Sequence, residues 1–196
     1  MKWIVLAILV VIVPYTWVTF HYRKPGKAFE PYGDLKKQAN VKRLLSAGFH
    51  RVALVAERPA DLGPTSVVTG ARAATAATPG GIPDVLGQAL LETPHLPNRV
   101  AGLIAAPTAN RLLAYTLQFT AGLPDNRESL HSAHLYSKDN ELFILVHFEP
   151  LPGELLSRTK ESVVRLTIPA GALESGNYQA TLVGTGNSVS WPLQVN

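Results

Sequence analysis

From residue 100 to the C-terminus, apolar and polar residues alternate in short runs that are separated by turn residues. In the last run Val189, Trp191, Leu193 and Val195 alternate with serine and glutamine, and Pro192 indicates an edge strand or a bulge. A two-residue period predicts strands that bury one face. Such runs lie at 50–57, 100–106, 112–120, 130–137, 142–149, 163–168, 177–183 and 188–195. Seven or eight short strands with regular turns predict a mainly β domain, built as an antiparallel sandwich.

Residues 173–178 read LESGNY. This segment resembles the tyrosine corner of immunoglobulin-like folds, where a tyrosine hydroxyl bonds back to the backbone just before a late strand. The resemblance covers about the last third of the chain and implies a structural role for Tyr178. The chain has no cysteine, so the resemblance points to a fold class and not to a family.

The N-terminus carries eighteen residues without a charge, from 3 to 20. As a helix this run would reach about 27 Å, so we expect residues 1–22 to form a single transmembrane anchor. A cleaved signal peptide is the alternative, but it would need a small-x-small cleavage site that residues 16–21 lack. The residues expected at the membrane interface are Trp3, Tyr15, Trp17, Tyr22, Arg23 and Lys24.

Residues 23–48 are predicted to form a basic juxtamembrane spacer and a short helix over about 35–46, with Asp34 as N-cap and Gly48 after its end. Its apolar face of Val41, Leu44 and Leu45 could lie on the membrane or dock on the domain, and docking is favoured. Half of the 18 Lys and Arg residues fall between residues 21 and 58. This positive charge predicts contact with membrane lipid and argues against nucleic acid as a partner.

The remaining residues, 49–196, are predicted to form the β-rich domain. Residues 59–81 are rich in Ala, Thr, Pro and Gly and predict a flexible loop, and residues 82–92 predict a short helix. Two observations conflict on the side of the membrane. The basic residues after the apolar run favour the cytoplasm, whereas a β-sandwich behind an N-terminal apolar segment favours export. We expect an extracytoplasmic domain, with a cytoplasmic membrane adaptor as the alternative.

The runs at 130–137 and 142–149 predict a hairpin with Asp139 at its tip. That register pairs His134 with Leu145 and Ser132 with His147. It gathers a candidate binding patch on one face, consisting of His134, Tyr136, Phe143 and His147. His131 and His134 are three apart and would face opposite sides of a regular strand, so no metal site or other cofactor is predicted.

Chemical motifs give no further assignment. The sequence contains no G-x-S-x-G or H-E-x-x-H pattern, no P-loop and no dinucleotide fingerprint. Acidic pairs near residues 125–128 and 139–141 are interpreted as turn residues. We therefore expect a membrane-tethered, non-catalytic interaction or scaffold module, such as a subunit of an envelope complex with a protein partner. A ligand- or glycan-binding sandwich and an enzyme with an unrecognised site are the alternatives.

Overall fold

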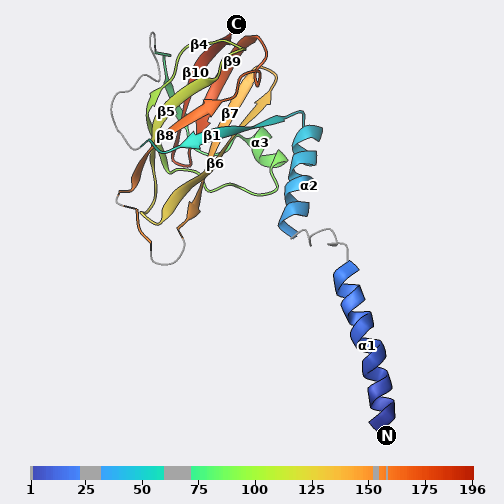
Figure 1. Ribbon diagram of the computed structural model, residues 1–196. Coiled ribbons are helices and arrows are strands. Elements are labelled where there is room, and N and C mark those ends of the chain that lie inside the picture. The colour runs from blue at the N-terminus through green and yellow to red at the C-terminus, as the bar shows by residue number, and fades with distance from the viewer. Residues whose placement is uncertain (1, 23–31, 60–71, 152–154, 158) are drawn as a thin grey trace. The chain divides into compact units, whose positions relative to one another are not determined.

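The computed structural model describes residues 2–22, 32–59, 72–151, 155–157 and 159–196. The chain divides into two units, residues 1–38 and residues 39–196, and the second is called the β-domain below. Its strands form one curled, mixed sheet, a half-barrel (Figure 1). In chain order the elements are α1 (Lys2–Tyr22), α2 (Tyr32–Ser46), β1 (His50–Glu57), β2 (Ala76–Pro79), α3 (Asp84–Ala89), β3 (Arg99–Ile104), β4 (Thr108–Ala109), β5 (Tyr115–Gly122), β6 (Glu128–Lys138), β7 (Glu141–Pro150), β8 (Glu161–Ile168), β9 (Gly176–Val183) and β10 (Asn187–Val195).

Helix α1 covers the apolar N-terminal run and continues through Pro14. The hydroxyls of Thr16 and Thr19 donate to the carbonyls of Ile12 and Tyr15, both at 2.7 Å, which satisfies these polar groups within the helix. In the described part of the chain, no helix combines the length and the apolarity that a bilayer crossing requires.

Helix α2 begins before Asp34, so the prediction of Asp34 as N-cap is wrong. An acidic residue is also favourable in the first turn, where it faces the positive end of the helix dipole. The predicted end is confirmed, because Gly48 has φ 81° and Phe49 N donates to Leu44 O at 2.9 Å. Leu44 is buried in the β-domain, whereas the other two apolar residues of the predicted face stay exposed.

The strand order is β2-β10-β9-β7-β6-β1-β8-β5-β3, and β4 also pairs with β10. Strand β1 joins the two halves of the sheet, because residues 50–54 pair with β6 and residues 55–57 pair with β8. The structure confirms the mainly β class but corrects the purely antiparallel arrangement, since β7–β9 and β4–β10 are parallel pairs. β8 follows β7 in the chain but lies beyond β1 in the sheet, where it runs opposite to β7. β9 reverses direction once more and pairs with β7, so these two strands are parallel.

The hairpin of β6 and β7 has the predicted register. His134 pairs with Leu145, Ser132 pairs with His147, and Asp139 adopts a positive φ of 51° at the tip. Alternate residues of this hairpin face the inside of the curled sheet and join its main apolar cluster. The largest fully buried side chains of that cluster include Trp191, Phe119, Phe148, Leu117, Leu135 and Leu166.

The outer face of β6, β7 and β9 is covered as well. The end of α2 is tied to the α3 region by two hydrogen bonds, from Arg43 Nη2 to Gln88 O (2.7 Å) and from Leu91 N to Asn40 Oδ1 (3.1 Å). This layer and the sheet beneath it share a second apolar cluster, which consists of Leu44, Phe49, Leu86, Ala89, Leu90, Leu96, Tyr136, Phe143, Leu145 and Val183. The sheet therefore has apolar cores on both sides at this hairpin.

The predicted flexible loop at 59–81 needs a correction. Residues 60–71 lie outside the described residues, but Ala76–Pro79 form the strand β2 on the outer edge of β10. β2 pairs with residues 187–190 of β10, and β4 pairs with residues 194–195. Pro192 lies in the interval between these two partners, which fits the predicted edge position because proline has no N–H to donate.

The β9–β10 turn closes the domain against the segment that leads into β3. The Asn187 side chain accepts a hydrogen bond from Val100 N (2.9 Å) and donates one to Val100 O (2.8 Å), as a paired strand residue would. Gly186 N donates to Asn98 O at 2.8 Å. A Cβ atom at Gly186 would lie 2.7 Å from Asn98 O, so the approach requires glycine. A side chain and a glycine turn thus join distant parts of the curled sheet.

Replacing Asn187 tests this closure. Asn187→Ala leaves a partly buried N–H and C=O of Val100 without their partner, so unfolding should become easier by about 1–3 kcal/mol. Urea denaturation followed by circular dichroism measures the change. Asn177→Ala, at an exposed position on β9, is the matched control and should change stability much less. Equal losses in the two variants would show that the bridge contributes nothing specific.

Candidate functional site

The structure separates the four residues of the predicted binding patch. Tyr136 and Phe143 are only 5% and 7% exposed, because α2, α3 and the segment after α3 cover them. His134 and His147 are partly exposed and lie beyond this cover. The sequence correctly places all four on one face of the hairpin, but the two aromatic residues belong to a core. The sequence gives no sign of the cover, because the covering residues lie far away along the chain.

A histidine surface occupies the uncovered part of this face. The pairing of β6 with β7 shifts register between Leu130 and Ser132. This bulge brings His131 next to His147, with ring centroids 5.5 Å apart, although a regular strand would place His131 on the opposite face from His134. The prediction that His131 and His134 face apart fails for this reason. His95, from the segment after α3, adds a fourth imidazole 6.2 Å from His147.

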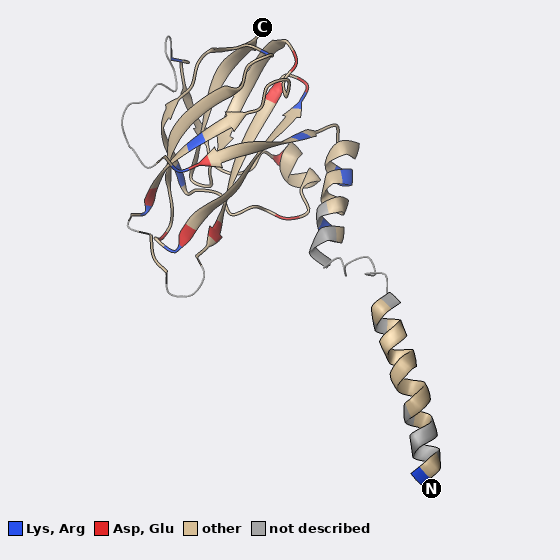
Figure 2. Cartoon of the chain, viewed as in Figure 1, with Lys and Arg blue, Asp and Glu red and all other residues tan. Residues whose placement is uncertain are grey.

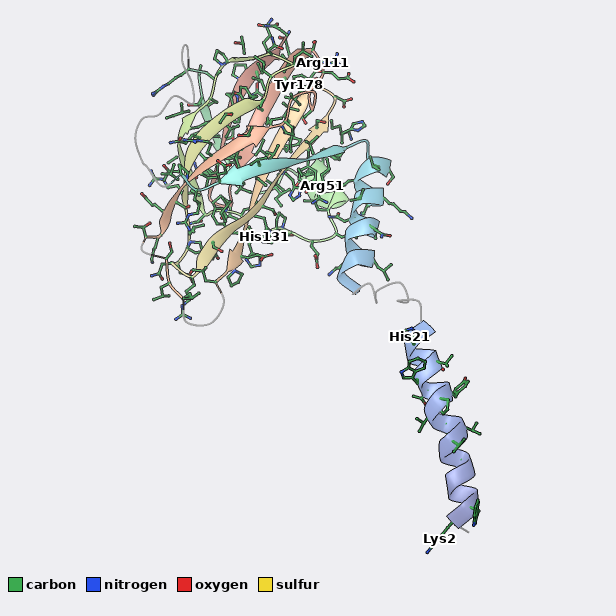
Figure 3. All side chains as sticks on the ribbon, in the orientation of Figure 1. Lys2, His21, Arg51, Arg111, His131 and Tyr178 are labelled. Atoms are coloured by element: carbon green, nitrogen blue, oxygen red, sulfur yellow. The ribbon has the colours of Figure 1, made fainter. Side chains whose placement is uncertain are left out.

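Charged neighbours set the protonation of this surface. Glu149 lies between two of the rings, 3.1 Å from His131 Nδ1 and 3.6 Å from His147 Nε2. Arg51 on β1 approaches His134 Nε2 from the other side of β6, and Figure 3 shows that Arg51 and His131 come from different strands. Since arginine only donates, His134 Nε2 must be an unprotonated acceptor.

The environment lowers the pKa of two of these imidazoles. Burial is the main cause for His134 and, together with Arg51 and the neighbouring histidines, lowers its pKa from 6.5 to about 4. Burial also lowers the pKa of His147, although Glu149 opposes that shift. Among the described residues, no group of three or more His, Asp or Glu is arranged to hold a metal ion. His134 and His147 therefore resist protonation more than an ordinary imidazole.

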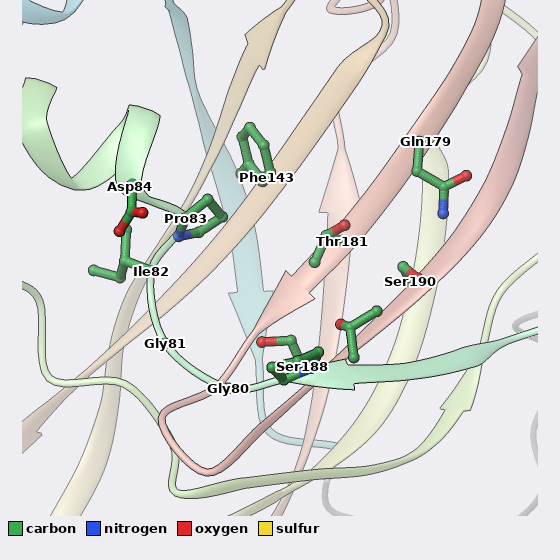
Figure 4. A pocket seen from close by; sticks show the side chains of 12 residues that line it. Gly80, Gly81, Ile82, Pro83, Asp84, Phe143, Gln179, Thr181, Ser188 and Ser190 are labelled. Carbon is green, nitrogen blue, oxygen red and sulfur yellow. The ribbon is translucent and has the colours of Figure 1, made fainter.

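A groove lies on the same side of the sheet, over β7, β9 and β10 (Figure 4). Its floor follows the pairing of strands: Phe143 on β7 pairs with Thr181 on β9, which pairs with Ser190 on β10. Its wall is the segment from the end of β2 to the start of α3. The volume is about 550 Å³, and the lining residues are Thr78, Pro79, Gly80, Gly81, Ile82, Pro83, Asp84, Phe143, Gln179, Thr181, Ser188 and Ser190.

The lining of the groove is nearly uncharged, and more of its surface is apolar than polar. Asp84 is the one ionisable side chain among the lining residues, and none of them is basic. Thr78 Oγ1 is buried without a hydrogen-bond partner in the described part of the protein. Elsewhere in the β-domain, acidic and basic residues are scattered, largely toward the ends of strands and in turns (Figure 2). Of the polar lining residues on β9 and β10, Gln179 and Thr181 stay accessible, whereas Ser188 and Ser190 are buried and the Ser188 hydroxyl is bonded to Gly184.

Sequence reasoning did not find the groove, although one signal for it exists. Ser188, Ser190, Thr181 and Gln179 all lie at the polar positions of their alternating runs, which assigns them to an outward face. Nothing in the sequence shows that β2 pairs with β10. The wall that turns this outward face into a groove therefore could not be predicted from the sequence.

The other predicted residues are placed as follows. Tyr178 Oη donates to Glu174 O at 3.1 Å, the kind of bond that the tyrosine corner describes. Trp3, Tyr15 and Trp17 are exposed on α1, and the Trp17 ring stacks on His21 at 5.1 Å. The backbone of Tyr22 ends α1, whereas Arg23 and Lys24 lie outside the described residues.

Acid should destabilise the β-domain through His134. Its pKa is lower in the folded chain than the ordinary 6.5, so below pH 6.5 the unfolded chain binds a proton that the folded chain does not. Stability should fall as the pH drops from 6.5 toward 4. The contribution is on the order of 1 kcal/mol, less than the full shift implies because His134 is partly exposed.

Comparing the wild type with His134→Gln isolates this contribution from that of other titrating groups. The difference in urea midpoint between the two proteins at pH 8, where His134 is neutral in both states, sets the reference. The wild type should lose more stability than His134→Gln between pH 7 and pH 4.5. Parallel pH profiles of the two proteins would contradict the assignment.

No family model, no curated protein and no solved structure matches this chain. Function is therefore inferred from the groove, the histidine surface and the exposed apolar side chains of α1.

Proposed function

We propose that this protein is a non-catalytic binding module that α1 holds at a membrane and that binds its ligand or partner in the groove over β7, β9 and β10. The groove is the observation that carries the proposal. It has a volume of about 550 Å³ and is open to solvent, so a short segment of a larger molecule could lie along it. The accessible side chains of Gln179 and Thr181 can fix the orientation of a bound molecule.

The wall of the groove is held in place without a ligand. Gly81 N donates to Gly184 O at 2.8 Å, and a Cβ atom at Gly80 would collide with Thr185 O. Beyond the wall, α3 buries Leu86 and Ala89 in the second apolar cluster. Because both ends of the wall are fixed, a ligand would not have to order this segment when it binds, which favours affinity.

Site-specific photo-crosslinking tests the groove. A benzophenone amino acid in place of Thr181 stands on the groove floor, and the same replacement of Thr120 on β5 stands at a partly exposed strand position outside it. In the full-length protein in its own membrane, irradiation should give an adduct from position 181 several times stronger than from position 120. Equal labelling at the two positions would reject the groove as the binding site.

The membrane tether rests on the surface of α1. Large apolar side chains are exposed along this helix, including Trp3 (84%), Val11 (68%) and Val13 (60%). Exposed apolar surface of this extent needs cover, and an apolar lipid environment supplies it. The aromatic residues near the helix ends match the preference of such rings for the membrane interface. We place the β-domain on the extracytoplasmic side, where an envelope partner would meet it.

Fractionation tests both the membrane tether and the side of the membrane on which the β-domain lies. The full-length protein should stay in the membrane pellet after carbonate extraction, and a chain that starts at Ala39 should be released. Protease added to intact cells should digest the β-domain if it is exported. Release of the full-length protein by carbonate would end the tether proposal. Protection from protease until the cells are lysed would instead favour the cytoplasmic adaptor.

A further inference from the structure

We infer that the outward side of α2 is a second membrane contact of this protein. Its exposed apolar side chains enter the interface of an anionic bilayer, while its other side stays docked on the β-domain. This inference rests on the proposed tether by α1 and goes beyond it, because it determines which side of the β-domain lies on the membrane. It depends on the exposed side chains of α2, on their charge and on the distance along the chain from α1.

One side of α2 is fixed to the β-domain. Leu44 is buried in the second apolar cluster, and the side chains of Asn40 and Arg43 are hydrogen-bonded to the α3 region. At about 100° per residue, these three positions fall within about 100° of one another around the helix axis. The opposite side of the helix is therefore turned away from the sheet.

That opposite side carries large apolar side chains that are open to solvent. Leu35, Val41 and Leu45 are 55%, 37% and 56% exposed. They fall within about 120° around the axis, centred opposite the docked side. A helix on the surface of a soluble domain normally turns polar residues outward. An apolar stripe in this position therefore indicates a surface that a partner covers.

The charge around the stripe identifies an anionic bilayer as that partner. Between residues 35 and 56 the sequence has no acidic residue and five basic ones, namely Lys36, Lys37, Lys42, Arg43 and Arg51. Lys42 is exposed and lies between Leu35 and Leu45 around the axis. A lysine can extend its ammonium group to a headgroup while apolar neighbours enter the acyl boundary. A bilayer interface supplies both environments side by side, which an apolar protein groove does not.

The length of the chain keeps α2 close to the membrane once α1 is inserted. The end of α1 and the start of α2 are joined by the nine residues 23–31. A chain of this length reaches at most about 35 Å when fully extended. This limit confines α2 to the neighbourhood of the bilayer and raises the effective concentration of lipid around it. A contact that would be too weak to recruit a free protein can form under these conditions.

Fluorescence quenching by lipids tests the contact. Because the chain has no cysteine, one introduced cysteine carries a single environment-sensitive fluorophore. Val13→Cys on α1, Leu45→Cys on α2 and Leu113→Cys in the turn before β5 are matched positions, since these side chains are 60%, 56% and 65% exposed. Each full-length variant is reconstituted into vesicles of phosphatidylcholine and phosphatidylglycerol that contain spin-labelled lipid as quencher.

The label at position 45 should be quenched several times more strongly than the label at position 113. It should also respond more to a nitroxide at the headgroup end of the acyl chain than to one at the chain terminus, because α2 lies in the interface. Quenching at 13 without an excess at 45 over 113 would overturn the inference and leave the tether in place. Absence of quenching at 13 would contradict the tether, and the α2 contact would fall with it.

Charge reversal tests the role of the anionic lipid. Lys42→Glu should lower the quenching at position 45 several-fold and leave the quenching at position 13 unchanged, because it replaces an attraction to the headgroups by a repulsion. Lys160→Glu, at an exposed position before β8, makes the same change of charge and should alter neither signal. Thermal unfolding of both variants checks that the β-domain folds. Equal effects of the two reversals at position 45 would overturn the assignment of this contact to α2.

Discussion

The contact between the β9–β10 turn and residues 97–100 allows ten strands to enclose one core. A curled sheet that stops short of closing leaves two edges whose N–H and C=O groups need partners. Here Asn187 supplies both partners for Val100, and backbone donors of the turn reach the carbonyls of Pro97 and Asn98. The same turn supports the groove, because its other side holds Gly80 and Gly81.

The β6–β7 hairpin is the second constraint, since both of its faces are buried. One face belongs to the main cluster inside the curl, and the other lies beneath α2 and α3. The layer of α2 and α3 leaves the outer face of the sheet uncovered at two places. At one end the histidine surface remains partly open, and at the other the wall from β2 to α3 rises over the strands and forms the groove. Both candidate surfaces are therefore borders of the second apolar cluster.

Much of the local structure can be predicted from the sequence, because it depends on neighbours along the chain. Alternation locates most of the strands, the hairpin register follows from its tip, and Gly48 ends α2 as a left-handed residue. Long-range pairing cannot be predicted in this way. Alternation gives no information about which strand lies beside β7, so its parallel pairing with β9 could not be predicted. An Ala/Thr-rich segment likewise gives no sign that it will form β2.

The candidate surfaces also combine features that local sequence predicts with features that depend on long-range contacts. Regular alternation places His134 and His147 correctly, but a single extra residue at the bulge moves His131 to their side, and no local signal marks that residue. The polar positions of β9 and β10 reveal an outward face. The groove itself exists only because a distant segment crosses over that face.

The interval on the outer edge of β10 has a consequence for self-association. Between β2 and β4, none of the described strands pairs with the outer edge of β10, and exposed strand edges can recruit further strands into aggregates. Pro192 lies in that stretch and offers no N–H. If a strand from another molecule paired here, one of its carbonyl groups would have no N–H donor, and the proline ring would hinder its approach. Pro192, which donates no hydrogen bond to a neighbouring strand, thus disfavours the addition of strands from other molecules at this edge.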